Sequence, residues 1–168
     1  MPARSVVKGV DVSGKKVWQI AAGDAEHNYA GLCLNRGVVL NGPGSEGPWP
    51  DCAEALRSKW GLSARKLADL RQFCEEMRDG DLVVLRVGTA EVYGVGVVVG
   101  SYLWCSEFAD VCGWSLQHVR RVRWLWKCSG EPKRFAPYTL KPGTTVQLLD
   151  SQQVIDWIAG LPADPGRL

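Results

Sequence analysis

Hydrophobic residues recur along this chain with two spacings. Alternating or short apolar runs are typical of strands, and spacings of three and four are typical of amphipathic helices. Strands are expected at residues 15–23, 38–40, 81–87, 91–100, 117–127 and 144–149. Helices are expected at residues 24–37 and 151–160, with one or two more within 51–78, divided near Gly61.

Polar and glycine residues predict where these elements begin and end. Asp24, Ser63 and Ser151 precede helical patterns and are good N-caps, and Gly37 suits the end of the first helix. Gly88 and the threonine after it suit a hairpin turn between two strands. The segment "NGPGSEGPWPD", with three glycines and three prolines, predicts a kinked loop.

Length and composition indicate one folded domain. The chain has 168 residues, of which 46% are hydrophobic and 23% charged, close to the averages for globular proteins. We expect the domain to span residues 15–160, between a flexible leader (1–14) and a tail or linker (161–168). An isolated domain of this size is expected to be monomeric.

The sequence favours a cytoplasmic protein without bound metal. No apolar run is long enough for a membrane span, and the N-terminus lacks the apolar core of a signal peptide. The six cysteines form no CxxC pair and match no histidine cluster, so we expect no zinc and no other cofactor. They are interpreted as reduced, small apolar residues, the alternative being a bridge between Cys105 and Cys112.

The segment "HVRRVRWLWK" at residues 118–127 carries the most uneven charge. No acidic residue lies between Asp110 and Glu131, although the formal net charge of the chain is only +2. A polyanion is therefore one interpretation, and a solvated strand paired with acids elsewhere is the other. In a strand, we expect Val122 and Trp124 to point inward.

Two glycines in "EVYGVGVVVG" share one face of the expected central strand. Gly94 and Gly96 leave that face without side chains. Close packing against a helix or a wall for a planar ligand are both consistent with this pattern.

Four stretches together resemble the EVE domain, a PUA-like relative of the YTH domains, and especially the EVE-like modules of Mcr-type and HNH restriction endonucleases. The resemblance covers residues 17–124. The stretches are "VWQIAAG", "GVVLNGPG", "MRDGDLVVLRVGTAEVYGVGVVVGSY" and "HVRRVRW".

The resemblance implies an α+β fold, a PUA-like pseudo-barrel of five to six mostly antiparallel strands with helices outside, which agrees with the element order. It also implies a non-catalytic reader that holds a methylated or hydroxymethylated base in an aromatic pocket. The base is expected in DNA rather than RNA, with a nuclease or ATPase effector fused or in trans and no membrane partner.

The resemblance and the residue types together indicate a base-binding pocket. Related readers place aromatic walls on the first strand, the loop after the second strand and the bend after the central hairpin. Asn41 and Asp24 are the expected readers of the base edge, since an amide donates and accepts while a carboxylate accepts. The expected pocket residues are Trp18, Ala22, Asp24, Asn41, Gly42, Trp49, Tyr102 and Trp104.

Phosphate contacts are expected along the basic strand and the loop before it, because arginine binds phosphate well. Three residues are expected to form an outward row, namely Arg121, Arg123 and Lys127, with His118 and Arg120 near the pocket mouth. Trp114 is a candidate stacking residue or wedge. Trp18, Trp60, Trp124 and Trp157 are assigned to the core first, and for Trp18 the pocket is the alternative.

Three other functions stay open. One is an RNA-binding PUA-like module. Another is a small ASCH-type hydrolase, which would use Lys16 with Glu91 and Tyr93. The third is a platform for protein interactions.

Overall fold

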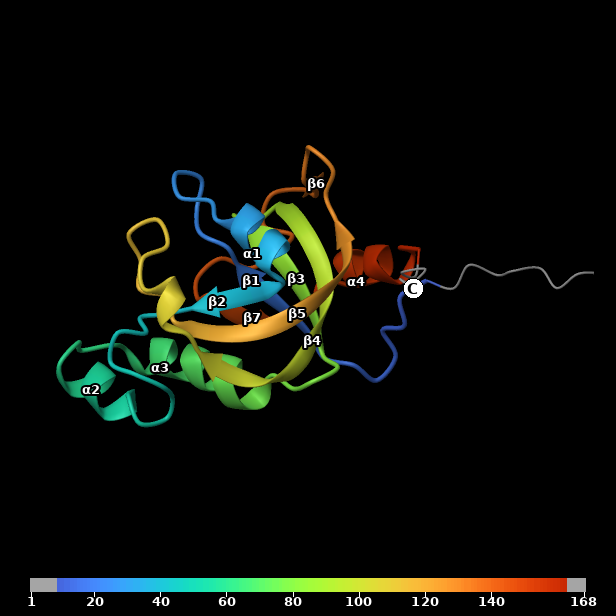
Figure 1. Cartoon of the computed structure of the whole chain (residues 1–168). Helices are drawn as coiled ribbons and strands as arrows, with labels where there is room; N and C mark the ends of the chain where they lie inside the picture. The colour runs from blue at the N-terminus through green and yellow to red at the C-terminus, as the bar shows by residue number, and fades with distance from the viewer. Residues whose placement is uncertain (1–8, 163–168) are drawn as a thin grey trace, which may run out of the picture.

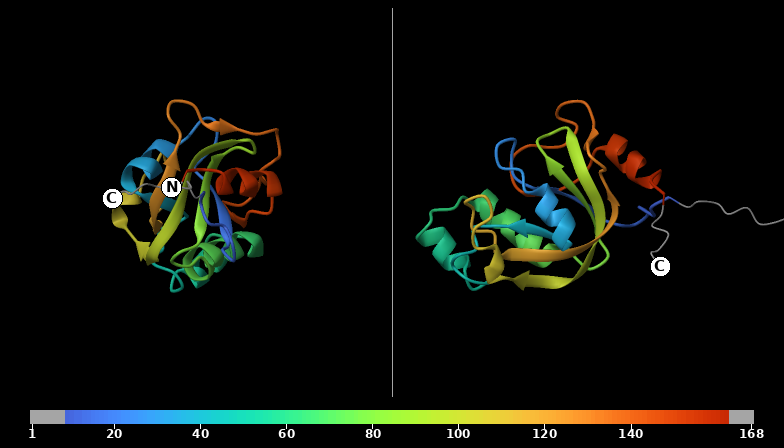
Figure 2. Two further views of the ribbon diagram at one scale, coloured as in Figure 1. Left: turned by 90° about the vertical axis from the view of Figure 1, so that its right-hand side faces the viewer. Right: turned by 45° about the horizontal axis from the view of Figure 1, so that its top comes forward.

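The computed structural model describes residues 9–162 as a strongly curved sheet with helices on its outside (Figures 1 and 2). The strands are β1 (Val17–Ala21), β2 (Val38–Asn41), β3 (Leu82–Val87), β4 (Glu91–Trp104), β5 (His118–Lys127), β6 (Lys133–Arg134) and β7 (Val146–Leu148). The helices are α1 (Ala30–Arg36), α2 (Ala53–Ser58), α3 (Ala64–Arg71) and α4 (Gln152–Ala159), with a π-helical turn η1 (Gln72–Glu76) and a 3-10 turn η2 (Ser106–Phe108).

The sheet order is β2-β5-β4-β3-β1-β7, and the short β6 pairs with β4. Only β1 and β3 run parallel; the other pairs are antiparallel. The predicted α+β class is confirmed, and this arrangement is compatible with a PUA-like pseudo-barrel. Its two edge strands, β2 and β7, leave a seam in the barrel wall.

Asp69 of α3 closes this seam with hydrogen bonds. One carboxylate oxygen, Oδ1, accepts from Asn41 Nδ2 at the end of β2 (3.1 Å) and from the amide of Val146 at the start of β7 (3.1 Å). The other, Oδ2, accepts from the amide of Thr145 (2.9 Å) and from Lys66 Nζ (3.0 Å). A buried carboxylate therefore joins the two edge strands.

The core has a large cluster inside the curved sheet and two smaller clusters outside it. Trp18, Ile20 and Val39 belong to the inner cluster, which α1 and η1 cover. The helix α4 packs Val154 and Ile158 against the outer side of the sheet. The third cluster lies between α2 and α3.

Most predicted helix boundaries are confirmed. Ser63 and Ser151 accept hydrogen bonds from backbone amides as N-caps, and Gly37 ends α1 in the left-handed conformation. The N-cap prediction for Asp24 is wrong, because α1 begins at Ala30. Asp24 instead holds a turn, where its Oδ1 accepts from the amides of Glu26 (2.9 Å) and His27 (2.8 Å).

The two central glycines serve close packing. A Cβ added to Gly94 would lie 2.7 Å from Leu34 Cδ2 of α1, and one added to Gly96 would lie 2.4 Å from Val122 Cγ1. Side chains of α1 and β5 therefore occupy the space that the glycines leave, so this face is not the wall of a pocket.

The chain ends of the described part are packed together. Gly9 pairs with Pro162, and Val10 and Leu161 are buried. The predicted leader and tail otherwise lie largely outside the described residues. Within residues 9–162, no helix is long and apolar enough to cross a membrane.

All six cysteines are free, including Cys105 and Cys112. Cys112 is exposed and so does not fill the core as predicted. In the described part of the chain, no three His, Cys, Asp or Glu side chains are grouped so that they could hold a metal ion.

Candidate functional site

A cavity of about 590 Å³ opens at the end of the barrel where β1, β2 and β7 meet the β4–β5 loop. This is the left-hand end in Figure 1, with the blue loop after β1, the gold loop before β5 and the green α2 around it. Pockets that bind small organic groups range from about 300 to 1,000 Å³. The cavity is therefore large enough for a planar ring system.

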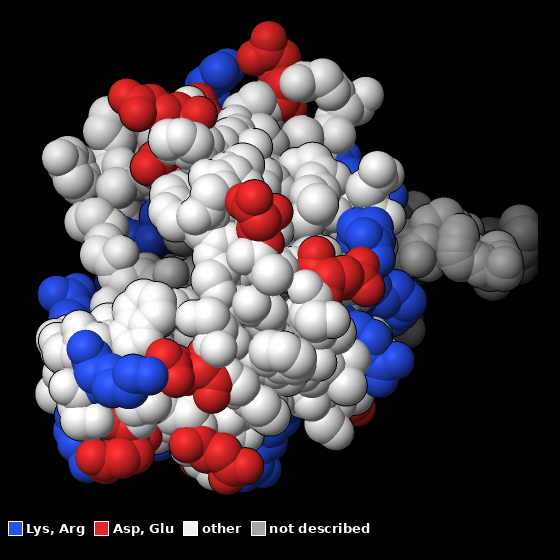
Figure 3. All heavy atoms as spheres, turned by 60° about the vertical axis from the view of Figure 1, so that its left-hand side comes forward, with Lys and Arg blue, Asp and Glu red and all other residues white. Residues whose placement is uncertain are grey.

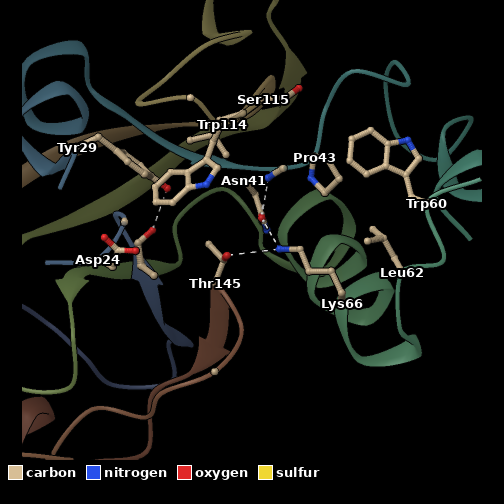
Figure 4. A pocket seen from close by; sticks show the side chains of 16 residues that line it. Asp24, Tyr29, Asn41, Pro43, Trp60, Leu62, Lys66, Trp114, Ser115 and Thr145 are labelled. Atoms are coloured by element: carbon tan, nitrogen blue, oxygen red, sulfur yellow. Dashed lines mark hydrogen bonds between the residues drawn. The ribbon is translucent and has the colours of Figure 1, made fainter. Parts of the chain in front are cut away.

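Trp114 forms one side of the cavity (Figure 4). It follows a tight turn in which Cys112 and Gly113 both have positive φ, at 54° and 89°, and it pairs with Val111 across that turn. The rings of His27 and Tyr29 meet its indole edge-on, at centroid distances of 5.4 and 6.0 Å. Its indole is thus fixed by aromatic contacts while 36% of the residue stays exposed.

Trp60 forms the opposite side, beside Pro43 (Figure 4). It lies in the link between α2 and α3, and its Nε1 donates to Glu46 Oε2 at 2.9 Å. The same hydrogen bond is the main reason that the pKa of the Glu46 carboxyl is lowered, which favours its charged form. Trp60 is 46% exposed, so the prediction that it belongs to the core is wrong.

The floor between the two indoles is polar (Figure 4). Lys66 Nζ donates to Asn41 Oδ1 (2.9 Å) and Asp69 Oδ2 (3.0 Å), with a longer contact of 3.4 Å to Thr145 Oγ1. Asn41 Oδ1 also accepts from the backbone amide of Gly42 (2.8 Å), so both acceptor positions of the Asn41 side-chain oxygen are used. Lys66 therefore keeps its third donor weakly engaged and able to face a ligand.

Gly42 allows the wall to close tightly. A Cβ at this position would lie 2.1 Å from the carbonyl oxygen of Ser115, a distance that no side chain can accommodate. The strand β2 and the Trp114 turn therefore approach each other through this glycine. Leu62, Leu116 and Pro43 supply the apolar part of the lining.

Asp24 lies on the rim of the cavity. Hydrogen bonds from the amides of His27 and Glu26 lower the pKa of its carboxyl, so it is charged at neutral pH. These bonds use Oδ1, and Oδ2 accepts none within residues 9–162. The rim therefore offers one fixed hydrogen-bond acceptor.

Of the predicted pocket residues, Asp24, Asn41 and Gly42 line this cavity. Ala22 is buried and does not line the cavity, although its neighbours Ala21 and Gly23 do. Trp18 lies in the core, where its Nε1 donates to Asp81 Oδ2 (2.9 Å), so its core assignment is confirmed and its alternative place in the pocket is wrong.

The other three predicted aromatic residues belong to the β2–α2 loop or bond to it, and none of them lines the cavity. Trp49 packs on the small cluster between α2 and α3 and donates Nε1 to Glu75 Oε2 (2.5 Å). Trp104 donates Nε1 to the carbonyl oxygen of Gly44 (2.8 Å). Tyr102 Oη lies 2.6 Å from His118 Nδ1 and accepts from the amide of Trp49 (3.0 Å). These side chains fasten the loop and do not line the cavity.

His118 and Arg120 are buried, so their predicted contacts with phosphate are wrong. His118 lies between Tyr102 and the carbonyl oxygen of Pro43 (3.2 Å from Nε2). Arg120 donates to the carbonyl oxygens of Phe73 (2.8 Å), Met77 (2.5 Å) and Gly100 (3.0 Å). Carbonyl oxygens at the end of a helical segment lack hydrogen-bond donors within that segment, and the Arg120 guanidinium provides these donors.

Acidification is expected to destabilise the fold through His118. Burial lowers the pKa of its imidazole to about 4, whereas in an unfolded chain the pKa is about 6.5. Its contribution is complete above pH 6.5 and is lost as pH falls toward 4, because only the unfolded chain then binds the proton. The loss approaches about 3 kcal/mol.

Denaturant unfolding of the wild type and His118→Gln between pH 7 and about pH 4 would measure this effect. The difference in unfolding free energy between the two proteins should shrink as the pH falls. A difference that stays constant would contradict the assignment to His118.

The predicted outward row on β5 is exposed as expected, and Val122 and Trp124 point inward. However, the row runs away from the cavity. His118 pairs with Asn41 at the cavity end of the strand, whereas Arg123 borders a separate hollow beside Gly9. On the face shown in Figure 3, acidic and basic side chains are interspersed over the left and lower parts, and basic side chains gather along the right-hand edge.

The three residues considered for an ASCH-type reaction are not assembled. Tyr93 Oη donates to Glu91 Oε1 (3.0 Å), next to the hairpin turn of β3 and β4. Lys16 precedes β1 and lies next to Leu82, at the opposite end of β3. The length of β3 therefore separates Lys16 from the other two residues.

Sequence reasoning did not single out Trp60, Lys66 and Thr145 as site residues. A signal for Lys66 was present, since Lys66 and Asp69 are three residues apart and so share a helix face. Nothing in the local pattern indicated that Thr145 would lie beside them, because that contact joins segments 79 residues apart.

Comparison with known proteins gives a family but no described function. No curated protein matches this chain. One similar solved structure is the crystal structure of the Toxoplasma CPSF4-YTH domain in apo form, with 12% sequence identity, a TM-score of 0.42, and coverage of 98% of this chain and 95% of that chain. The resemblance to EVE domains and restriction systems stays a prediction. Residues 18–149 match a family model described as a domain of unknown function, and the chain therefore belongs to this family, DUF8426.

Proposed function

We propose that this domain is a non-catalytic reader of a modified nucleobase, which it takes from a DNA strand into the cavity between Trp114 and Trp60. The observation that carries the proposal is the pair of exposed indoles on opposite sides of one cavity above a polar floor. Aromatic side chains stack on bases of any sequence, and each stacked base contributes about 1–3 kcal/mol. Enclosure in such a cavity requires that the base leave the helical stack.

The polar groups suit a base edge. The carboxylate of Asp24 accepts hydrogen bonds only, so it favours a base with an exocyclic amino group. Lys66 donates from the floor on the other side of the cavity. Together they favour cytosine or adenine over thymine, which lacks an amino group.

The apolar lining suits the modification. Leu62, Leu116 and Pro43 offer carbon surface that a methyl group can contact. Burying one methyl group contributes about 0.8 kcal/mol, which corresponds to about fourfold in affinity. Binding rather than catalysis is proposed because Asn41, Asp69 and two of the three Lys66 donors are committed to hydrogen bonds that hold the fold together. A role as the sensor of a nuclease or ATPase partner rests on the sequence resemblance.

Binding to matched oligonucleotides tests this proposal. Fluorescence anisotropy would compare DNA duplexes with one methylcytosine, hydroxymethylcytosine or methyladenine against the unmodified duplex, and against RNA of the same sequence. We expect one modified DNA to bind about fourfold or more tightly than its unmodified form, with affinity falling as salt rises. Equal affinity for every duplex would refute the reader function, and preference for the RNA would assign the domain to RNA.

A further inference from the structure

The turn formed by residues 142–145, here called the Gly143 turn, borders four hollows, three of which are lined by Gly143 itself. Gly143 and Thr145 line the base cavity, and Pro142 and Gly143 line a hollow of about 600 Å³ next to it. A third hollow, of about 250 Å³, lies between this turn and the start of α3. A nucleic-acid strand with one base in the cavity would therefore pass next to the Gly143 turn.

Arg65 of α3 lies against this turn without an acidic partner. A Cβ added to Gly143 would lie 2.7 Å from Arg65 Nη2, so the guanidinium packs against the bare glycine backbone. No carboxylate lies within 4 Å of Arg65 in the described part of the chain. By contrast, the exposed arginines that pair with glutamates are Arg36, Arg57, Arg71 and Arg134.

Arg86 adds a buried positive charge beneath the same turn. It is 4% exposed, and it donates from Nη2 to the carbonyl oxygen of Thr144 (3.2 Å) and from Nη1 to that of Gly88 (2.8 Å). Its Nε has no acceptor, and no carboxylate among residues 9–162 forms an ion pair with it. A buried cation without a counter-charge is costly unless an anion approaches it.

The positions of nearby carboxylates determine on which side of the Gly143 turn an anion would bind more favourably. Asp24 and Glu91 both border the hollow that Arg86 lines, and they would repel an anion there. Arg65 lines two hollows: the one it shares with Gly143 is lined by no acidic residue, and the other is lined by Asp69, which is paired with Lys66. The amides of Gly143 and Thr144 also find no acceptor within the described chain, so they are able to donate. Because Asp69 is already paired with Lys66, Arg65 supplies the excess positive charge on this side of the turn.

We propose that Arg65 and the Gly143 turn bind the phosphate group next to the captured base, so that the phosphate contact lies on α3 and not on the basic strand β5. This inference rests on the proposed function, because it assigns the phosphate of the same nucleotide. Arginine suits such a contact because its planar donors match two phosphate oxygens. The proposed ligand is thus a nucleotide within a DNA strand. Its base lies in the cavity between Trp60 and Trp114, and its phosphate lies in the hollow beside Arg65.

NMR titration separates the two contacts. The probes are 5-methyldeoxycytidine, 5-hydroxymethyldeoxycytidine and N6-methyldeoxyadenosine, the 3′- and 5′-monophosphates of each, and inorganic phosphate, added to the wild type, to Arg65→Gln and to the control Arg71→Gln. Arg71 lies on the same helix, is exposed and pairs with Glu76. The indole Nε1–H signals of Trp60 and Trp114 report the base, and the amides of Gly143 and Thr144 report the phosphate.

One monophosphate should bind the wild type roughly tenfold more tightly than the nucleoside, since hydrogen bonds to charged groups are strong. Arg65→Gln should remove this gain and leave nucleoside affinity unchanged, while Arg71→Gln should keep the gain. A monophosphate that binds no better than the nucleoside, or a gain that survives in Arg65→Gln, would overturn the phosphate site and leave the base cavity standing.

Failure of the base cavity is recognised separately. If no nucleoside or nucleotide moves the two indole signals, the proposed function fails. The anion site is then judged by inorganic phosphate alone. Shifts at Gly143 and Thr144 that vanish in Arg65→Gln would support it, and their absence in the wild type would refute it.

Discussion

Replacing Trp60 and Trp114 together with alanine is expected to weaken binding of the preferred modified DNA by at least about thirtyfold. Each stacked face contributes about 1–3 kcal/mol, and the two indoles face the cavity from opposite sides. Each single variant should lose part of this affinity. Both residues are exposed enough that neither loss should unfold the protein. Anisotropy measures the affinity, and near-ultraviolet circular dichroism checks the fold.

Variants at the other aromatic positions separate this cavity from the one expected from the sequence. Trp104→Phe leaves a ring in place but removes the hydrogen bond to Gly44, and it should leave DNA affinity nearly unchanged. Trp157→Phe, on the remote helix α4, serves as a neutral control. If Trp104→Phe weakened binding more than Trp114→Ala does, the base would bind beside Trp104 and the present assignment would be wrong.

The fold could be predicted largely because its strands carry an unambiguous apolar pattern. The buried β3 and the glycine-rich β4 have the sequence pattern of strands. Gly37 indicates the end of α1 before β2, and Gly88 indicates the turn between β3 and β4. The start of α1 could not be predicted in the same way. Asp24 suits a helix cap and a tight turn equally well, and only the hydrogen bonds of the folded loop distinguish them.

The candidate site was predicted in part, at Asp24, Asn41 and Gly42, because these residues lie at or shortly after the ends of β1 and β2. The placement of the tryptophans failed for a tertiary reason. Trp49 and Trp104 seemed free to reach a base because they lie in or near loops, but each indole N–H is held by an acceptor elsewhere. Trp60 seemed to continue a helix, whereas α2 ends at Ser58 and leaves it outside.

Arg120 shows why charge alone misplaced the phosphate contacts. Its alternation with Arg121 places one guanidinium inside the sheet and the next outside. A charged side chain is rarely buried without a partner, so exposure was the reasonable expectation. The partners are carbonyl oxygens of η1 and of Gly100, far away in sequence, and no local pattern reveals them.

Replacing Asp69 with alanine is expected to lower the free energy of unfolding by about 3–5 kcal/mol, the range for breaking a buried charged network. Its carboxylate accepts from Asn41 Nδ2, Lys66 Nζ and two backbone amides of the seam. Alanine leaves all four donors without this acceptor. Denaturant unfolding at neutral pH measures the change.

The variant Asp69→Asn should be nearly as damaging, although it keeps the shape of the side chain. Each carboxylate oxygen faces two donors, so an amide in either orientation points its NH₂ group at two donors. Asp51→Asn is the matched control, because Asp51 is exposed and its change should stay within about 0.5 kcal/mol. An Asp69→Asn variant as stable as the control would contradict this hydrogen-bond arrangement.

A double-mutant cycle links this seam to the cavity floor. Lys66→Met and Asp69→Asn each remove one side of the contact between Lys66 Nζ and Asp69 Oδ2, so their effects on unfolding should not add. A coupling energy of at least about 0.5 kcal/mol is expected for residues in direct contact. The same cycle measured on DNA affinity then shows whether the floor acts through its own donors or through the seam. If Lys66→Met alone lowers affinity while stability is little changed, Lys66 contacts the base. If affinity falls only in variants that also lose stability, the hydrogen bonds of Lys66 and Asp69 stabilise the fold, and the base is recognised mainly by the indoles of Trp60 and Trp114.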